Sequence, residues 1–204
     1  MALEPMRGTS PAISPRILPG ILRPPLRLPD MNHDRYGDDY IRSILVGVKS
    51  VAVVGASTNP ARASNIVVKY LVGKKYRTYP VNPVYAGQKI LGQMCYASLA
   101  DLPEPVDVVD IFRRPDAVPA VVEEALQQDP KPKVIWMQLA VRDDAAAARA
   151  EAEGVKVVMN RCMKIEYGRL SGEIAWFGVN TQLVTSRKPI LGDLTQTLDL
   201  GTGS

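Results

Sequence analysis

The 204-residue chain has few of the residues on which common catalytic and structural sites depend. Its two cysteines, Cys95 and Cys162, are too few for a disulfide framework or a four-cysteine zinc site. Any Ser-His-Asp triad, histidine-rich metal site or phosphohistidine relay would have to use the single histidine, His33. Because His33 lies between Asn32 and Asp34, before the apolar pattern of the chain begins, we expect a solvated side chain.

Long apolar runs and a strong charge of one sign are also missing. No run of about 18 or more apolar residues occurs, which excludes an ordinary transmembrane helix. The 25 lysines and arginines against 21 aspartates and glutamates leave a net charge of +4, too small by itself to indicate a nucleic-acid partner. Prolines and arginines interrupt any apolar stretch that could serve as a secretory signal. We expect a cytoplasmic protein without a membrane or nucleic-acid partner.

Proline is abundant only at the start of the chain. Of the 17 prolines, these fall in the first 30 residues: Pro5, Pro11, Pro15, Pro19, Pro24, Pro25 and Pro29. They would break the amphipathic helix that a transit peptide needs. We therefore expect residues 1–30 to form a disordered, proline-rich segment outside the folded domain, with Met31 as a candidate for the true start of the protein.

Short apolar runs alternate with helical periodicity between residues 50 and 160. The apolar runs predict strands over residues 50–54, 76–81, 106–112, 133–138 and 155–159. Apolar spacing and capping residues predict helices over 39–48, 66–72, 115–126 and 143–153, with Ser64 as N-cap of the second. This alternation predicts right-handed βαβ units and a single α/β domain: a Rossmann-like, doubly wound parallel sheet in a three-layer α/β/α arrangement.

The pattern weakens after Tyr167. We expect the domain to span residues 36–170 and residues 171–204 to form a C-terminal extension. The extension adds either an edge strand or an arm for a homodimer, with its apolar part around Trp176 and Phe177.

Small and cationic residues follow the predicted strands. In an open parallel sheet, ligands bind beyond the carboxyl ends of the strands, where the strand order reverses. Gly55 and its small neighbours would let a phosphate approach backbone N–H groups near a helix start. A single glycine is also common where a strand simply ends in a turn. Guanidinium groups, which suit phosphate oxygens, are supplied by Arg62, Arg113, Arg114 and Arg161. The strand ends therefore indicate a polyanionic ligand.

Known phosphate-binding motifs are absent from the first of these loops. Gly55 is the only glycine in the segment 55–60, so the loop has neither the G-x-G-x-x-G dinucleotide fingerprint nor the Gly-Lys-Ser/Thr ending of a P-loop.

Several motifs nevertheless occur together in a recognisable order: VVGAS at 53–57, YPVNP at 79–83, VDVVDIFRR at 106–114 and NRCMKIEY at 160–167. Over residues 36–170 the chain resembles the small, stand-alone CoA-binding domain proteins. That family is related to the CoA-binding domain of the succinyl-CoA synthetase alpha subunit. The resemblance implies a site for coenzyme A or an acyl-CoA at the carboxyl ends of the strands, with a strand order of 2-1-3-4-5 and the switch point between Gly55 and Phe112.

The resemblance also implies a role for each strand end. The diphosphate loop would consist of Gly55, Ala56 and Ser57. Two residues at the following helix start would lie beside it, namely Arg62 and Ser64.

The other strand ends would hold the remainder of the ligand. The nucleotide side would be lined by Val81, Asn82 and Pro83. The nucleotide and pantetheine would be covered by Phe112, Arg113 and Arg114, and the pantetheine arm would pass Gln138.

Four positions depart from the family pattern. Ala63 replaces a usual proline, Lys75 a usual glycine and Asn160 a common aspartate. Ala140 stands where a glycine often follows the glutamine, and its methyl group would narrow the thiol end of the pocket.

Side chains at the predicted site also have structural interpretations. Arg113 and Arg114 could pair with acids such as Asp110 or Asp116. Asp110, inside an apolar strand, is expected to be a buried, hydrogen-bonded carboxylate rather than a general base.

Cys162 also has two interpretations. Its neighbours Arg161 and Lys164 would favour a thiolate, and a mixed disulfide with the thiol of CoA would then follow. An inert buried thiol is the more common case.

The leading hypothesis is a protein that binds CoA or acyl-CoA, a nucleotide-containing small molecule, without independent ligase activity. Related ligases need a phosphorylated histidine and partner domains, and this chain has one histidine outside the sheet. The alternative is an NAD(P)-binding enzyme or redox sensor on the same fold. It is disfavoured by the missing glycines and by Asn82-Pro83, where a ribose-binding acid would be expected. A third possibility is a non-enzymatic interaction module. We expect no metal site.

Overall fold

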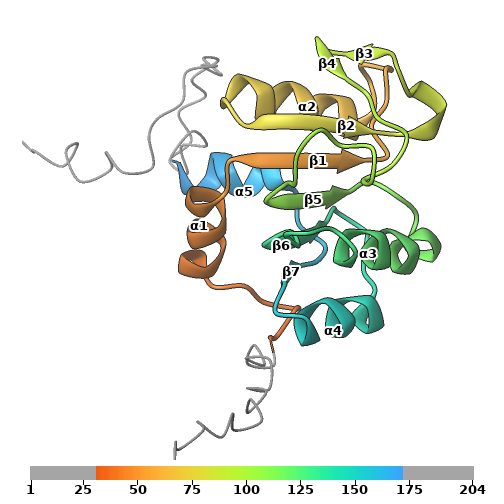
Figure 1. Ribbon diagram of the computed structural model, residues 1–204. Helices are drawn as coiled ribbons and strands as arrows, with labels where there is room; N and C mark the ends of the chain where they lie inside the picture. The colour runs from red at the N-terminus through yellow and green to blue at the C-terminus, as the bar shows by residue number, and fades with distance from the viewer. Residues whose placement is uncertain (1–30, 172–204) are drawn as a thin grey trace, which may run out of the picture.

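Five parallel strands form the central sheet, stacked from β2 at the top to β7 at the bottom of Figure 1. A computed structural model of the protein describes residues 31–171. The strands are β1 (Ser50–Val54), β2 (Arg77–Val81), β5 (Val108–Ile111), β6 (Val134–Met137) and β7 (Lys156–Val158). Their order, β2-β1-β5-β6-β7, is the 2-1-3-4-5 order that the family resemblance implied. The Rossmann-like α/β fold is thereby confirmed.

Helices cover both faces of this sheet. One face packs against α1 (Asp38–Gly47), α2 (Ala63–Gly73) and α5 (Met163–Leu170). The other packs against α3 (Val118–Leu126) and α4 (Asp144–Ala152). Every residue of β1, β5 and β6 is buried, which explains why the sequence shows apolar runs there rather than alternation. Ser50 and Asp110 are the polar exceptions in these strands.

The predicted helix starts are partly correct. Asp143 caps α4, because its side chain accepts a hydrogen bond from the N–H of Ala146 at 2.9 Å. The assignment of Ser64 as the N-cap of α2 was wrong: the extended residue before the helix is Arg62, and Ser64 lies buried in the first turn. The helix therefore starts with no side-chain cap.

Smaller elements complete the fold. A hairpin of β3 (Lys89–Ile90) and β4 (Gln93–Met94) lies beside β2, and one-turn helices η1 (Pro83–Tyr85) and η2 (Pro115–Ala117) follow two of the strand ends. Of these, η2 forms the first turn of the helix predicted over residues 115–126, whereas the hairpin and η1 were not predicted. Helix α5 was also missed, although its buried Met163, Tyr167 and Leu170 recur at helical spacing.

The N-terminal segment of the described chain covers the outer edge of β7. The Tyr36 hydroxyl accepts a hydrogen bond from the N–H of Met159 at 2.7 Å, and the Tyr40 hydroxyl donates to the carbonyl of Val157 at 3.3 Å. Two outward-facing backbone groups of an edge strand are thus satisfied by side chains.

The prediction of a solvated His33 was wrong. Only 11% of its side chain is exposed, with Nδ1 2.8 Å from the Tyr36 hydroxyl and Nε2 3.3 Å from the Glu151 carboxylate. Its polar sequence neighbours gave no sign of this: Tyr36 is only three residues away, but Glu151 is brought to His33 by the fold.

Some predictions lie outside the described residues: the disordered segment 1–30 and the arm around Trp176 and Phe177. Within residues 31–171, no helix is both long and apolar enough to cross a membrane.

Candidate functional site at the carboxyl ends of the strands

The loop after β1 can contain only glycine at its first position. Gly55 has a φ of +91°, and a Cβ atom added there would lie 2.6 Å from the carbonyl oxygen of Phe112. The N–H groups of Gly55 and Ala56 both donate to the carbonyl of Val81, at 2.8 and 3.3 Å. The loop is therefore fixed between the ends of β2 and β5, the predicted switch point.

A second set of hydrogen bonds shapes the chain between this loop and α2. The Asn65 side-chain amide donates to the carbonyl of Ser57 at 2.8 Å, while the Ser57 hydroxyl accepts from the N–H of Asn59 at 3.1 Å. Within residues 31–171, the N–H groups of Ser57, Ala63 and Ser64 have no hydrogen-bond partner. The uncapped positive end of α2 and these donors suit an anion. Asn65 was not predicted as part of this site.

The predicted nucleotide-side residues connect the first two loops. Asn82 donates from Nδ2 to the carbonyl of Ala56 at 2.7 Å and accepts at Oδ1 from the N–H of Val84 at 3.1 Å. The Val81 side chain is buried, so its contribution to the site is the carbonyl group that holds the first loop. Pro83 is exposed and begins η1.

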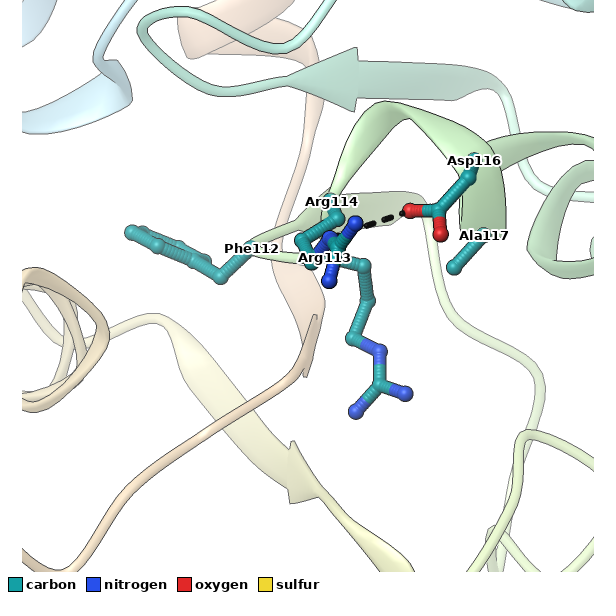
Figure 2. A pocket seen from close by; sticks show the side chains of 5 residues that line it. All are labelled: Phe112, Arg113, Arg114, Asp116 and Ala117. Atoms are coloured by element: carbon teal, nitrogen blue, oxygen red, sulfur yellow. Dashed lines mark ion pairs between the residues drawn. The ribbon is translucent and has the colours of Figure 1, made fainter.

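A cleft of about 440 Å³ opens after β5, lined by Phe112, Arg113, Arg114, Asp116 and Ala117. Figure 2 shows the Phe112 ring pointing away from the two guanidinium groups. Arg114 lies 3.4 Å from the Asp116 carboxylate, so the expected pairing with a neighbouring acid is found for this arginine.

Arg113 differs from its neighbour. Its Cδ atom would be 3.1 Å from a Cβ at Gly55, so the side chain passes over the first loop. Within the part of the chain that the structure describes, neither Arg113 nor Arg62 forms an ion pair. Among the described residues, no acid therefore neutralises Arg113 over the first loop or Arg62 at the start of α2.

Asp110 and Gln138 form a buried pair beneath the strand ends. Asp110 has no exposed surface, and Gln138 donates from Nε2 to both carboxylate oxygens, at 2.9 and 3.0 Å. The expectation of a buried, hydrogen-bonded carboxylate is confirmed. Burial raises the pKa of Asp110 to about 8, and the hydrogen bond from Gln138 only partly offsets this.

Of the two interpretations of Cys162, the structure supports the inert, buried thiol. The residue is 9% exposed, and burial raises the pKa of its thiol, although the N–H groups at the start of α5 and Lys164 act in the opposite direction. The nearby cation Arg161 lies 3.8 Å from Glu166 and 5.6 Å from the centre of the Tyr36 ring. The positive charge expected beside the thiol is therefore shared with these groups.

Two residues at the ends of β6 and β7 have left-handed backbones. Ala140 has a φ of 63° and Asn160 a φ of 52°, and the side-chain oxygen of Asn160 accepts a hydrogen bond from the N–H of Ala140 at 2.9 Å. Both positions depart from the family pattern, and this contact joins them. Among residues 31–171, no group of three or more histidine, cysteine or acidic side chains is placed to hold a metal ion.

Comparison with known proteins gives a family match. A family model described as the CoA binding domain matches residues 49–168. The uncharacterized protein YneT of Bacillus subtilis is 35% identical over 127 residues, which cover 62% of this chain and 91% of that protein. The ADP-forming acetate–CoA ligase I of Archaeoglobus fulgidus is 33% identical over 135 residues, 62% of this chain but only 19% of the ligase.

Solved structures share the fold. A hypothetical protein from Pyrococcus horikoshii is 39% identical, with a TM-score of 0.63 over 70% of this chain and 98% of that one. A Thermus thermophilus protein, cell-free ID.343, is 36% identical, with a TM-score of 0.62 over 66% of this chain and 98% of that one.

Proposed function

The chain belongs to the CoA-binding domain family, and we propose that it binds coenzyme A or an acyl-CoA at the carboxyl ends of β1, β2, β5 and β6. The family is related to a domain of the ADP-forming acetate–CoA ligases. The proposal assigns the binding of the ligand, rather than any ligase reaction, to this chain.

The observation that carries the proposal is the unneutralised cationic surface around the Gly55 loop. Arg113 crosses that loop without an ion-pair partner in residues 31–171, and α2 begins there with free N–H groups at Ala63 and Ser64. A diphosphate placed against the loop would receive charge-assisted hydrogen bonds from these donors. The 440 Å³ cleft that Arg113 also lines is within the size range of small-molecule sites.

Binding without ligase chemistry is supported by the histidine. The ring of His33, the only histidine of the chain, is held between Tyr36 and Glu151 at the β7 edge. The residues that align with the acetate–CoA ligase make up 19% of that enzyme, so its activity belongs to a much larger protein.

Thermal unfolding with matched concentrations of CoA, acetyl-CoA, NAD and NADP tests the proposal. A specific ligand raises the midpoint by mass action, so CoA or acetyl-CoA should raise it and the dinucleotides should not. A rise with NAD or NADP and none with either CoA compound would favour the dinucleotide alternative.

Two arginine variants locate the site. Arg113→Ala should lose most of the CoA-induced rise while its midpoint without ligand stays close to that of the wild type. Arg149→Ala is the matched control, because Arg149 pairs with Glu123 and Glu153 in the last turn of α4. If CoA raised the unfolding midpoint of Arg113→Ala as much as that of the wild type, the binding site would lie elsewhere on the protein.

A further inference from the structure

The buried pair beneath the site has one polar atom that the protein leaves open. The Gln138 nitrogen is used by Asp110, and no hydrogen bond within residues 31–171 reaches its carbonyl oxygen, Oε1. Gln138 is only 4% exposed. Among the described residues, however, every fully buried side-chain nitrogen or oxygen has a hydrogen-bond partner, so the unpartnered Oε1 is not fully buried. Oε1 therefore remains accessible, at the carboxyl end of β6 where the pantetheine arm is expected.

The protonation state of Asp110 decides which end of the Gln138 amide is presented there. An ionised carboxylate only accepts hydrogen bonds, so the amide turns its NH2 group inward and its carbonyl outward. A protonated carboxyl group carries an O–H donor, which the amide carbonyl can accept, and an N–H of the amide is then free to point outward. One proton thus exchanges an acceptor for a donor at the same place.

Among the described residues, no charged neighbour fixes Asp110 in one protonation state. Its strand neighbours in β1 and β6 are Val53 and Trp136. Helices α1, α2 and α5 pack on this face, where the buried titratable groups are Lys74, Tyr76, Cys95, Cys162, Glu166 and Tyr167. The Cys162 thiol is the group of these that interacts with Asp110, and no charged residue contributes to the pKa of Asp110.

We propose that Asp110 and Gln138 form a proton-dependent selector that distinguishes a free thiol from a thioester at the end of the bound ligand. With Asp110 ionised, the Gln138 carbonyl accepts a hydrogen bond from the S–H of free CoA. With Asp110 protonated, the Gln138 N–H donates to the carbonyl of an acyl thioester. The selector rests on the proposed function, because both ligands are CoA compounds held by the same phosphate-binding loop.

Titration calorimetry with CoA and acetyl-CoA tests the selector. The ratio of the two dissociation constants, acetyl-CoA over CoA, should rise roughly 3- to 10-fold between about pH 6.5 and about pH 8.5, the effect of one hydrogen bond gained or lost. The phosphates and adenine are common to both ligands, so their own ionisation cancels in the ratio.

Substitutions at the pair identify the titrating group. Asp110→Asn keeps the shape and removes the ionisation, so the ratio should become independent of pH while both ligands still bind. Gln138→Met removes the amide and should flatten the ratio in the same way. Asp107→Asn is the matched control at the opposite end of the sheet, and it should keep the pH dependence of the wild type.

The outcomes separate the two proposals. If neither CoA compound binds at either pH, the proposed function itself fails. If both bind with a ratio that does not change with pH, binding stands and the selector is wrong. A pH-dependent ratio that survives in Asp110→Asn and Gln138→Met would also overturn it, because another group would then be titrating.

Discussion

Asp107 and Asp110 lie three residues apart and show how differently the two ends of the sheet are built. At the amino end, Asp107 lies 2.8 Å from the Lys133 ammonium group and accepts hydrogen bonds from the N–H groups of Lys49 and Ser50. At the carboxyl side, Asp110 has the Gln138 amide as its hydrogen-bond donor, and no cation among the described residues pairs with it. The amino end is closed by its own contacts, whereas groups at the carboxyl end remain available for a ligand.

The same difference holds beyond the two aspartates. The carboxyl ends contain Arg62 and Arg113, which form no ion pair within residues 31–171, and an accessible Gln138 carbonyl. They also contain three left-handed residues: Gly55, Ala140 and Asn160. Strain and unsatisfied groups of this kind concentrate at functional sites, because a ligand can supply the missing contacts. The following variants test whether the two ends of the sheet differ in this way.

The largest effect is expected from Gly55→Ala. The added Cβ would lie 2.6 Å from the Phe112 carbonyl oxygen, at a backbone conformation that alanine adopts poorly. We expect a loss of about 2–4 kcal/mol in the free energy of unfolding, measured by urea denaturation. Gly154→Ala is the control, since its φ is +80° but nothing lies within 4 Å, and it should cost only about 1 kcal/mol. Equal losses would mean that the approach of β5 to the first loop is unimportant.

The two aspartates should have opposite effects on the pH dependence of stability. The pKa of Asp110 is raised to about 8 from an unfolded value of about 3.9. The free energy of unfolding therefore falls as the pH rises from about 3.9 to about 8, because only the folded state still holds the proton there. Asp110→Asn should therefore be more stable than the wild type at about pH 9, by roughly 1–3 kcal/mol. If the wild type, measured relative to Asp110→Asn, were less stable at pH 5 than at pH 8, the raised pKa of Asp110 would be contradicted.

Asp107→Asn should be destabilising near neutral pH. Burial alone would raise the pKa of Asp107, but Lys133 and the N–H groups of Lys49 and Ser50 outweigh it and hold the pKa below its usual range. Its stabilisation is present above about pH 3.9 and is lost as the pH falls through the folded-state value. We expect a loss of about 1–2 kcal/mol at pH 7 that shrinks in acid, followed by circular dichroism. A constant loss across this range would point to packing rather than charge.

The neighbouring arginines should differ in ligand binding. Arg113→Ala removes an unpaired cation above the first loop and should weaken CoA binding by roughly 10-fold or more, as expected for a charge-assisted hydrogen bond. Arg114→Ala removes an exposed cation already paired with Asp116 and should weaken it less. Calorimetry on both variants decides this, and a larger loss in Arg114→Ala would reverse the roles given to the two side chains.

The smallest effect concerns the left-handed alanine at the end of β6. Ala140→Gly would relieve the strain of a φ of 63°. It would keep the backbone N–H of residue 140 that donates a hydrogen bond to the side-chain oxygen of Asn160. We expect thermal unfolding to show a gain of up to about 1 kcal/mol. A loss of stability would show that the methyl group packs favourably in its present position.

The sequence predicts the fold better than the details of the site. Uninterrupted apolar runs such as Val51–Val54 indicate a sheet buried on both faces, and the VDVVDIFRR and VVGAS motifs place the strand ends. The short hairpin was missed because Leu91, a residue that rarely adopts a left-handed backbone, forms its turn with a φ of 52°.

Contacts between distant segments explain the remaining differences. The contact of His33 with Glu151 joins residues far apart in the sequence, and at Cys162 desolvation outweighs the lowering of the thiol pKa by Lys164. Asn65 contributes through its bond to the Ser57 carbonyl, and its only sequence signal was a polar residue on an otherwise apolar helix face. Burial and pairing of this kind depend on which segments meet, which local patterns do not specify.

The central claim is that this chain binds a CoA compound through the carboxyl ends of its strands. Titration calorimetry of CoA into the wild-type protein, with NAD in a parallel experiment, tests it most directly. We expect saturable binding of CoA with one site per chain and no saturable binding of NAD. Saturable binding of NAD with no binding of CoA or acetyl-CoA would contradict it.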